Sequence, residues 1–250
     1  MAGIECVLLL TLGLCVGSFV NVLIWRIPRG EEFVRTSSHC VLCGHRLSWR
    51  DLIPVVSFLL LRGRCRYCGS RITRRYPAVE LLNALLWLWA GLCFRGDIFQ
   101  TAVFCGLGSL LLALAFIDWE HFIIPNGINL AIALLGLLRL MTDGENRGLY
   151  LAGMLGAGGM FWLLHHISGG RGMGMGDVKL AAAAGLLLGW QKMVLAVLIA
   201  SLSGIGIHSL RMKRGAGSRL AFGPYLALGI WLAALTGERV TAWYLTWLGL

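Results

Sequence analysis

Two aspartates, Asp118 and Asp177, stand where long apolar stretches of the sequence meet short polar segments. Asp118 follows Ala-Phe-Ile, and Asp177 follows Gly-Met-Gly and precedes another apolar run. Placing a carboxylate at membrane depth costs at least ~2.5 kcal/mol, so such a residue usually has a function. Neighbouring carboxylates push their pKa values apart and can divide the roles of acid and base. The pair therefore predicts acid–base chemistry, provided that the two side chains meet.

Each acidic residue near the apolar stretches also has a structural interpretation. Asp118 can mark the end of a helix, and Asp177 can be a helix N-cap. Glu80, a third such residue, can pair with a nearby arginine such as Arg74 or Arg75. The residues alone leave both interpretations open.

A second chemical pattern is a repeated Cys-x-x-Cys-Gly. It occurs at Cys40 and Cys43 and again, after 21 intervening residues, at Cys65 and Cys68. Two such pairs fit a tetrahedral zinc site with four thiolate ligands. Four thiolates leave no open coordination position, and a reducing cytosol disfavours disulfides. We therefore expect structural zinc in a small ribbon-like loop that depends on the metal for much of its folding energy.

The elements that must position these residues are membrane helices. The chain of 250 residues is 58% hydrophobic and 14% charged, and its mean hydropathy is +0.76. These values predict an all-α integral membrane protein, because helices satisfy the backbone in lipid and no strand-like alternation dominates. We expect eight spans, which lie at residues 5–24, 78–95, 99–117, 124–141, 148–167, 177–190, 192–210 and 219–236. The tail 240–250 is too short to cross a membrane and is expected at its surface.

Basic residues predict the orientation of these spans. Of the 22 Lys and Arg, 16 fall in the four loops 25–77, 118–123, 168–176 and 211–219. By the positive-inside rule those loops are cytoplasmic, so both termini are periplasmic and both aspartates lie on the cytoplasmic side. The same distribution argues against nucleic-acid binding, despite the net charge of +10.

The loops divide the chain into three parts. These are a first helix at 1–24, a four-cysteine loop domain at 25–77 and a transmembrane core at 78–250. Glycine-rich segments at 153–159 and 169–176 predict close helix packing and a flexible loop, respectively. The second segment is not a dinucleotide cradle, since no strand precedes it.

Several motifs together resemble a known family. Gly174-Met-Gly-Asp177 is the signature of the GxGD membrane aspartyl proteases, and its extension Val-Lys-Leu resembles the type IV prepilin leader peptidases. Other stretches agree in order over nearly the whole chain, namely Gly17-Ser-Phe-Val-Asn21, the cysteine pairs, Tyr76-Pro-Ala-Val-Glu80, Ile124-Pro-Asn126 and Phe222-Gly-Pro-Tyr225. One departure is Ala221, where many relatives have proline.

The resemblance implies a bacterial inner-membrane enzyme. It would remove the basic leader from prepilins or type II secretion pseudopilins at the cytoplasmic face, and then methylate the new N-terminus with S-adenosylmethionine. It implies that Asp118 and Asp177 are catalytic and that the four cysteines bind zinc. It assigns no residues to the methyl donor.

Two other classes of protein remain as alternatives. A transporter or proton-coupled channel also uses intramembrane carboxylates, although the hydropathy lacks inverted repeats. A non-catalytic scaffold of a pilus or secretion machine would tolerate substitution of both aspartates.

Overall fold

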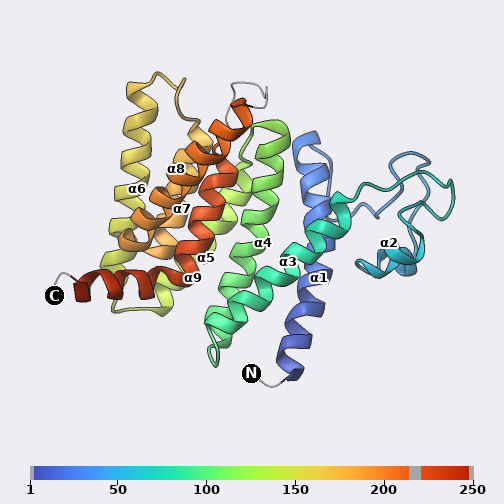
Figure 1. Cartoon of the computed structure of the whole chain (residues 1–250), viewed down its shortest axis with the longest axis horizontal. Coiled ribbons are helices and arrows are strands. Elements are labelled where there is room, and N and C mark those ends of the chain that lie inside the picture. Colours follow the sequence, from blue (N-terminus) through green and yellow to red (C-terminus); the bar gives the residue numbers. More distant parts are fainter. Residues whose placement is uncertain (1–2, 214–220, 248–250) are drawn as a thin grey trace. The chain divides into compact units, whose positions relative to one another are not determined.

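The computed structural model describes residues 3–213 and 221–247, and these residues form helices with only isolated bridges in place of strands. The longer helices are shown in Figure 1. They are α1 (Gly3–Arg26), α3 (Arg75–Cys93), α4 (Ile98–His121), α5 (Asn126–Thr142), α6 (Arg147–Ile167), α7 (Met175–Leu188), α8 (Trp190–Lys213) and α9 (Gly223–Trp247). Three short elements, η1 (Ile27–Arg29), η2 (Trp49–Leu52) and α2 (Val56–Leu60), lie between α1 and α3.

Length and hydropathy make this an integral membrane protein. Among the described residues, five helical segments are long and apolar enough to cross a bilayer, namely Gly3–Arg29, Arg75–Cys93, Ile98–His121, Arg147–Ile167 and Trp190–Leu210. Each of the eight expected spans overlaps a helix, but the count of eight is not established. The helix α7 has 14 residues, which is about 21 Å and shorter than a hydrocarbon core of about 30 Å.

The chain forms two compact units, Met1–Ala113 and Leu114–Leu250. In the first unit, α1 and α3 pack closely because small residues line their contact. A Cβ on Gly13 would lie 2.7 Å from the Ala84 Cα, and one on Gly17 would lie 2.8 Å from the Glu80 Cα. The Asn83 amide donates to the Gly13 carbonyl at 2.7 Å. The sequence Gly13-x-x-x-Gly17 therefore forms a close-packed helix contact.

In the second unit, α7 is the most enclosed helix, and its buried residues occur on all of its sides. A Cβ on Gly153 of α6 would overlap the Gly185 carbonyl of α7, so the two backbones meet at these glycines. The expected close packing around residues 153–159 is confirmed here. A single residue, Gly189 with φ +81°, then joins α7 to α8. That conformation favours glycine and allows the tight turn that the sequence predicts.

Two predicted boundaries change. The helix α4 continues to His121, so Asp118 lies in its last turn instead of after its end. The helix α9 continues to Trp247, so the expected surface tail is helical as far as the structure describes it. Figure 1 shows the last part of α9 turning sharply from the direction of its first part. The basic loop at 211–219 lies mostly outside the described residues.

Candidate functional site

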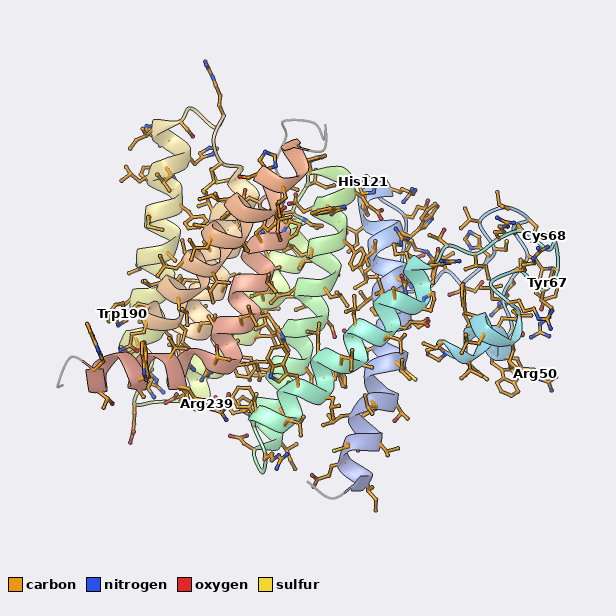
Figure 2. The ribbon with its side chains drawn as sticks, in the orientation of Figure 1. Arg50, Tyr67, Cys68, His121, Trp190 and Arg239 are labelled. Atoms are coloured by element: carbon orange, nitrogen blue, oxygen red, sulfur yellow. The ribbon has the colours of Figure 1, made fainter. Side chains whose placement is uncertain are left out.

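Asp118 sits in the last turn of α4, three residues before His121, which Figure 2 labels. Its side chain is buried, with 6% of the residue exposed. One carboxyl oxygen, Oδ2, accepts the backbone N–H of Gly223 at 2.9 Å. A Cβ at position 223 would lie 2.6 Å from that oxygen. The start of α9 therefore approaches the carboxyl group through a backbone that has no side chain.

Asp177 is the third residue of α7, which begins after Gly174. The expectation that Asp177 is itself the N-cap is wrong. Its Oδ2 reaches back and accepts the Gly174 N–H at 3.2 Å, which is the bond that an acidic residue in this position makes to a free N–H at a helix start. Its other oxygen, Oδ1, is buried without a hydrogen-bond partner.

Asp118 and Asp177 both belong to the second unit, and the Asp118 carboxyl group is near enough to act electrostatically on that of Asp177. The segment after Asp118 also contacts the glycine turn. The Asn129 amide donates to the Gly176 carbonyl at 3.3 Å, and a Cβ on Gly176 would lie 2.8 Å from the Ile124 Cβ. Glycine at position 176 therefore lets the turn pack closely against the chain that follows α4.

Lys179 has a different partner from the one that its position in the sequence suggests. We expect a lysine two residues after Asp177 to favour the aspartate anion, but the Lys179 Nζ donates to the Asn126 Oδ1 at 2.8 Å. Its role in the structure is to join the start of α5 to α7. Together with the bond from Asn129 to Gly176, this contact ties α5 to the glycine turn and to the first residues of α7.

Asp118 is buried and Asp177 is half-buried, and two interacting carboxyl groups can hold one proton between them, because neighbouring like charges cannot both ionise easily. Such a pair can activate a water molecule with its ionised member and donate a proton with the other. The two aspartates are therefore suited to hydrolysing an amide or ester bond near the end of α4 and the start of α7.

The four cysteines also converge, in the first unit. The Sγ atoms of Cys40, Cys43, Cys65 and Cys68 all lie within 4.8 Å of one another, and those of Cys40 and Cys68 are 4.0 Å apart. Ligands at Zn–S bonds of about 2.3 Å around a tetrahedron are about 3.8 Å apart. The four donors therefore fit a metal ion of this kind.

The repeated pattern of the sequence is also a repeat of structure, with an offset of 25 residues. The Gly44 N–H donates to the Cys40 carbonyl at 2.8 Å, and the Gly69 N–H donates to the Cys65 carbonyl at 2.9 Å. Both glycines have positive φ, +68° and +70°, which explains why glycine follows each second cysteine.

The pKa values of the clustered thiols move in both directions, because burial and the neighbouring Cys40 and Cys68 thiols raise the pKa of Cys43 to about 11. The backbone N–H of Cys43 holds the pKa of the Cys40 thiol down to about 6, and the Ser70 hydroxyl lowers the pKa of the Cys68 thiol. The two neighbouring histidines make other contacts, as expected. The His45 ring lies 3.6 Å from the Tyr67 ring, and the His39 Nδ1 is 3.3 Å from the Ser37 carbonyl oxygen.

Two buried polar residues in the first unit have roles that sequence reasoning missed. The Arg26 guanidinium is buried and donates to the carbonyls of Glu32, Thr36 and Ser37 at 2.8–3.1 Å. It thereby orders the chain that leads from α1 to the cysteines. Glu80 accepts the Val55 N–H at 2.7 Å. The position of Arg26, directly after the first apolar run, could have indicated its role. Nothing in the sequence around Val55 indicates that its N–H binds Glu80.

The fold and the sites define a helical membrane protein with a carboxyl pair at one end of its second unit and a thiol cluster in its first. The chain belongs to the type IV leader peptidase family, whose model matches residues 105–208. Residues 11–94 match the bacterial peptidase A24 N-terminal domain.

Relatives agree over most of the chain. A prepilin leader peptidase/N-methyltransferase of Pseudomonas aeruginosa is 34% identical, and the match covers 100% of this chain and 96% of that protein. One from Stutzerimonas stutzeri is 35% identical over 94% of this chain and 92% of the relative. One from Myxococcus xanthus is 39% identical over 85% of this chain and 65% of the relative. No solved structure matches the chain.

Proposed function

We propose that this chain is a membrane aspartic endopeptidase of the bacterial inner membrane. It removes the basic leader from type IV prepilins or type II secretion pseudopilins at the cytoplasmic face, and then methylates the new N-terminus. The family and the names of its relatives support this activity. The observation that carries it is that Asp118 and Asp177 lie in one compact unit, near enough for the first carboxyl group to act electrostatically on the second.

In the proposed reaction one water molecule lies between the two carboxyl groups, of which one is ionised and one protonated. The ionised carboxylate takes a proton from the water as the water oxygen attacks the scissile carbonyl carbon. The protonated partner stabilises the developing oxyanion and then donates its proton to the leaving amine. We assign Asp177 as the base, since the first turn of α7 favours negative charge, and Asp118 as the acid. The pair titrates as a unit.

The test is cleavage of a prepilin-like peptide by the purified full chain in lipid nanodiscs. Asp118→Asn and Asp177→Asn should each abolish cleavage, while the amount of inserted protein stays unchanged. Asp143→Asn is the matched control, because Asp143 follows the end of α5 that is remote from Asn126, and it should cleave normally. Cleavage retained in either site variant would defeat the mechanism.

Two further measurements, of assembly and of flux across liposomes, separate the two alternatives from the peptidase. A scaffold predicts that the aspartate variants behave like the unmodified chain in assembly and that no peptide is cut. A transporter or proton-coupled channel predicts proton or solute flux across liposomes that depends on the aspartates, without cleavage. Membership of a peptidase family favours neither.

For the first unit we propose that the cysteines hold structural zinc in a ribbon-like domain at residues 25–77. The first helix at 1–24 and the core at 78–250 flank this domain. The convergence of four thiols supports the metal. The distribution of basic residues supports eight spans with both termini periplasmic and the carboxyl pair cytoplasmic.

The methyl transfer is proposed from the relatives' names alone, and S-adenosylmethionine is its donor. When bound, the donor supplies an electrophilic methyl group to the amine that cleavage exposes. We leave its binding residues unassigned. Purified protein should bind S-adenosylmethionine in a calorimetric titration, and failure to bind would leave only the peptidase.

A further inference from the structure

The metal-binding loop carries an apolar tip between its two cysteine pairs. We define the tip as residues 52–60, which comprise the end of η2 and the helix α2. Leu59 and Leu60 are 67% and 77% exposed, and Leu52, Ile53 and Val56 are also exposed. Five exposed large apolar side chains therefore lie within nine residues, and a concentration of exposed apolar side chains marks an interaction site.

A hydrogen bond holds the tip beside the first turns of α3. The Val55 N–H, directly before α2, donates to the Glu80 carboxylate at 2.7 Å, and the Ser18 hydroxyl of α1 also bonds to Glu80. Glu80 is the sixth residue of α3, about 7 Å along the helix from Arg75. In Figure 1, α2 correspondingly lies level with the middle of α1 and below the start of α3.

The backbone at Val55 indicates how firmly the tip is held. Its φ is +60°, a conformation that a β-branched residue rarely adopts and that persists only where surrounding contacts impose it. The bond to Glu80 is such a contact. The tip is therefore held against α3 and does not hang freely from the loop.

Basic residues surround the tip. Arg50 precedes it, and Arg62 and Arg64 follow it, and all three are exposed. Figure 2 places Arg50 beside α2, on the side of the loop away from Cys68. The one carboxylate in the segment 48–66, Asp51, is bound to Arg66 at 2.7 Å. The arginines around the tip therefore present positive charge next to apolar surface.

We propose that the tip inserts into the headgroup region of the bilayer that α1 and α3 cross, and that its arginines bind anionic lipid phosphates. The exposed apolar side chains, the position of the tip beside α3 and the basic border together match the chemistry of an anionic membrane surface. A second copy of the chain and a substrate helix are the alternative partners of the tip. Neither would require arginines around the apolar side chains. The inference does not depend on the peptidase activity.

The test uses a photoreactive benzoylphenylalanine at position 60 of the full chain in nanodiscs. The control carries the same residue at position 42, because Leu42 is 75% exposed in the same loop but outside the tip. Nanodiscs contain phosphatidylcholine alone or with phosphatidylglycerol, and mass spectrometry identifies the adducts. Metal content equal to that of the unmodified protein shows that each variant has folded.

We expect lipid adducts at position 60 in several-fold excess over position 42, with a further increase when phosphatidylglycerol is present. Arg62→Gln with Arg64→Gln should remove that increase but keep the adducts. Equal lipid adducts at the two positions would overturn the proposal. Adducts at position 60 that contain peptide from another copy, or from an added prepilin, in place of lipid would also overturn it.

Discussion

Gly223 is the residue where the smallest change should cost the most activity. Its N–H bonds to the Asp118 Oδ2 at 2.9 Å, and a Cβ there would lie 2.6 Å from the same oxygen. Gly223→Ala must therefore displace the carboxyl group, and a displacement of about 1 Å at a catalytic group can lower the rate about 100-fold. Steady-state cleavage of a prepilin-like peptide measures this effect, with the loss expected in kcat.

Gly127→Ala is the control for that substitution. A Cβ at position 127 meets nothing within 4 Å, although the residue lies in the first turn of α5, beside Asn126. Cleavage should stay within about twofold of the unmodified chain. If both alanine variants were equally active, Asp118 would not need its contact with α9.

The second prediction for single residues concerns acid stability at the other end of the second unit. The Tyr150 hydroxyl donates to Asp143 at 2.6 Å and, with Asn146, lowers the pKa of that carboxyl. A carboxyl group with a lowered pKa stabilises the fold above its unfolded pKa of about 3.9, and this contribution is lost as pH falls through the folded pKa. Tyr150→Phe should therefore cost about 1 kcal/mol near neutral pH and less at acid pH.

Thermal unfolding in detergent between neutral pH and about pH 3 measures that difference. The two proteins should converge in melting temperature as the pH falls. A difference that stayed constant over this range would mean that the hydroxyl acts through packing alone.

At the scale of elements, the contact between α6 and α7 sets the stability of the second unit. A Cβ on Gly153 would overlap the backbone at Gly185, whereas one on Gly156 meets nothing within 4 Å. Gly153→Ala should destabilise the protein by about 1–3 kcal/mol because the helices must separate. Gly156→Ala, on the same helix, should be neutral or slightly stabilising because alanine favours helix. Thermal unfolding of the two variants compares them, and equal melting temperatures would contradict a close contact at Gly153.

Sequence reasoning located every long helix but misplaced several ends. Apolar runs identify helices well, since burial in lipid requires about 20 such residues. Ends depend on local backbone bonds that side-chain polarity does not reveal. The helix α4 continues past Asp118 to His121, and the Asp118 carboxyl group accepts the Gly223 N–H from a residue 105 positions away. For the same reason the sequence predicts the aspartates themselves but not Gly223 as their neighbour.

At the scale of the whole molecule, the metal should matter to one unit and not to the other. Structural zinc supplies about 10 kcal/mol or more to small folds of this kind, and the cysteines lie entirely within the first unit. A strong chelator, or Cys65→Ser, should make the loop 25–77 sensitive to trypsin at its arginines. Far-UV circular dichroism should stay nearly constant, because the long helices persist.

Cys105→Ser is the matched control for Cys65→Ser, since Cys105 is also a buried cysteine of the first unit but lies outside the cluster. In the Cys105→Ser variant the loop 25–77 should resist trypsin. If chelation left the loop equally resistant, the thiols would pack without a metal.

The class of protein can be predicted from the composition, the Gly-x-Gly-Asp motif and the repeated cysteine motif. The division of the chain into two compact units cannot be predicted from the sequence. The boundary at Ala113 falls inside the continuous helix α4, and residues 109–117 around it include no glycine, proline or charged residue. A sequence reveals a boundary through such residues, so a boundary within an apolar helix stays hidden.

The two cysteine turns share the same backbone hydrogen bond, and each contributes two of the four sulfurs. A tetrahedral ion of the proposed kind takes four ligands, so neither turn could complete the site without the other. Disruption of one turn should therefore open the whole loop, although the cysteines of the other turn remain.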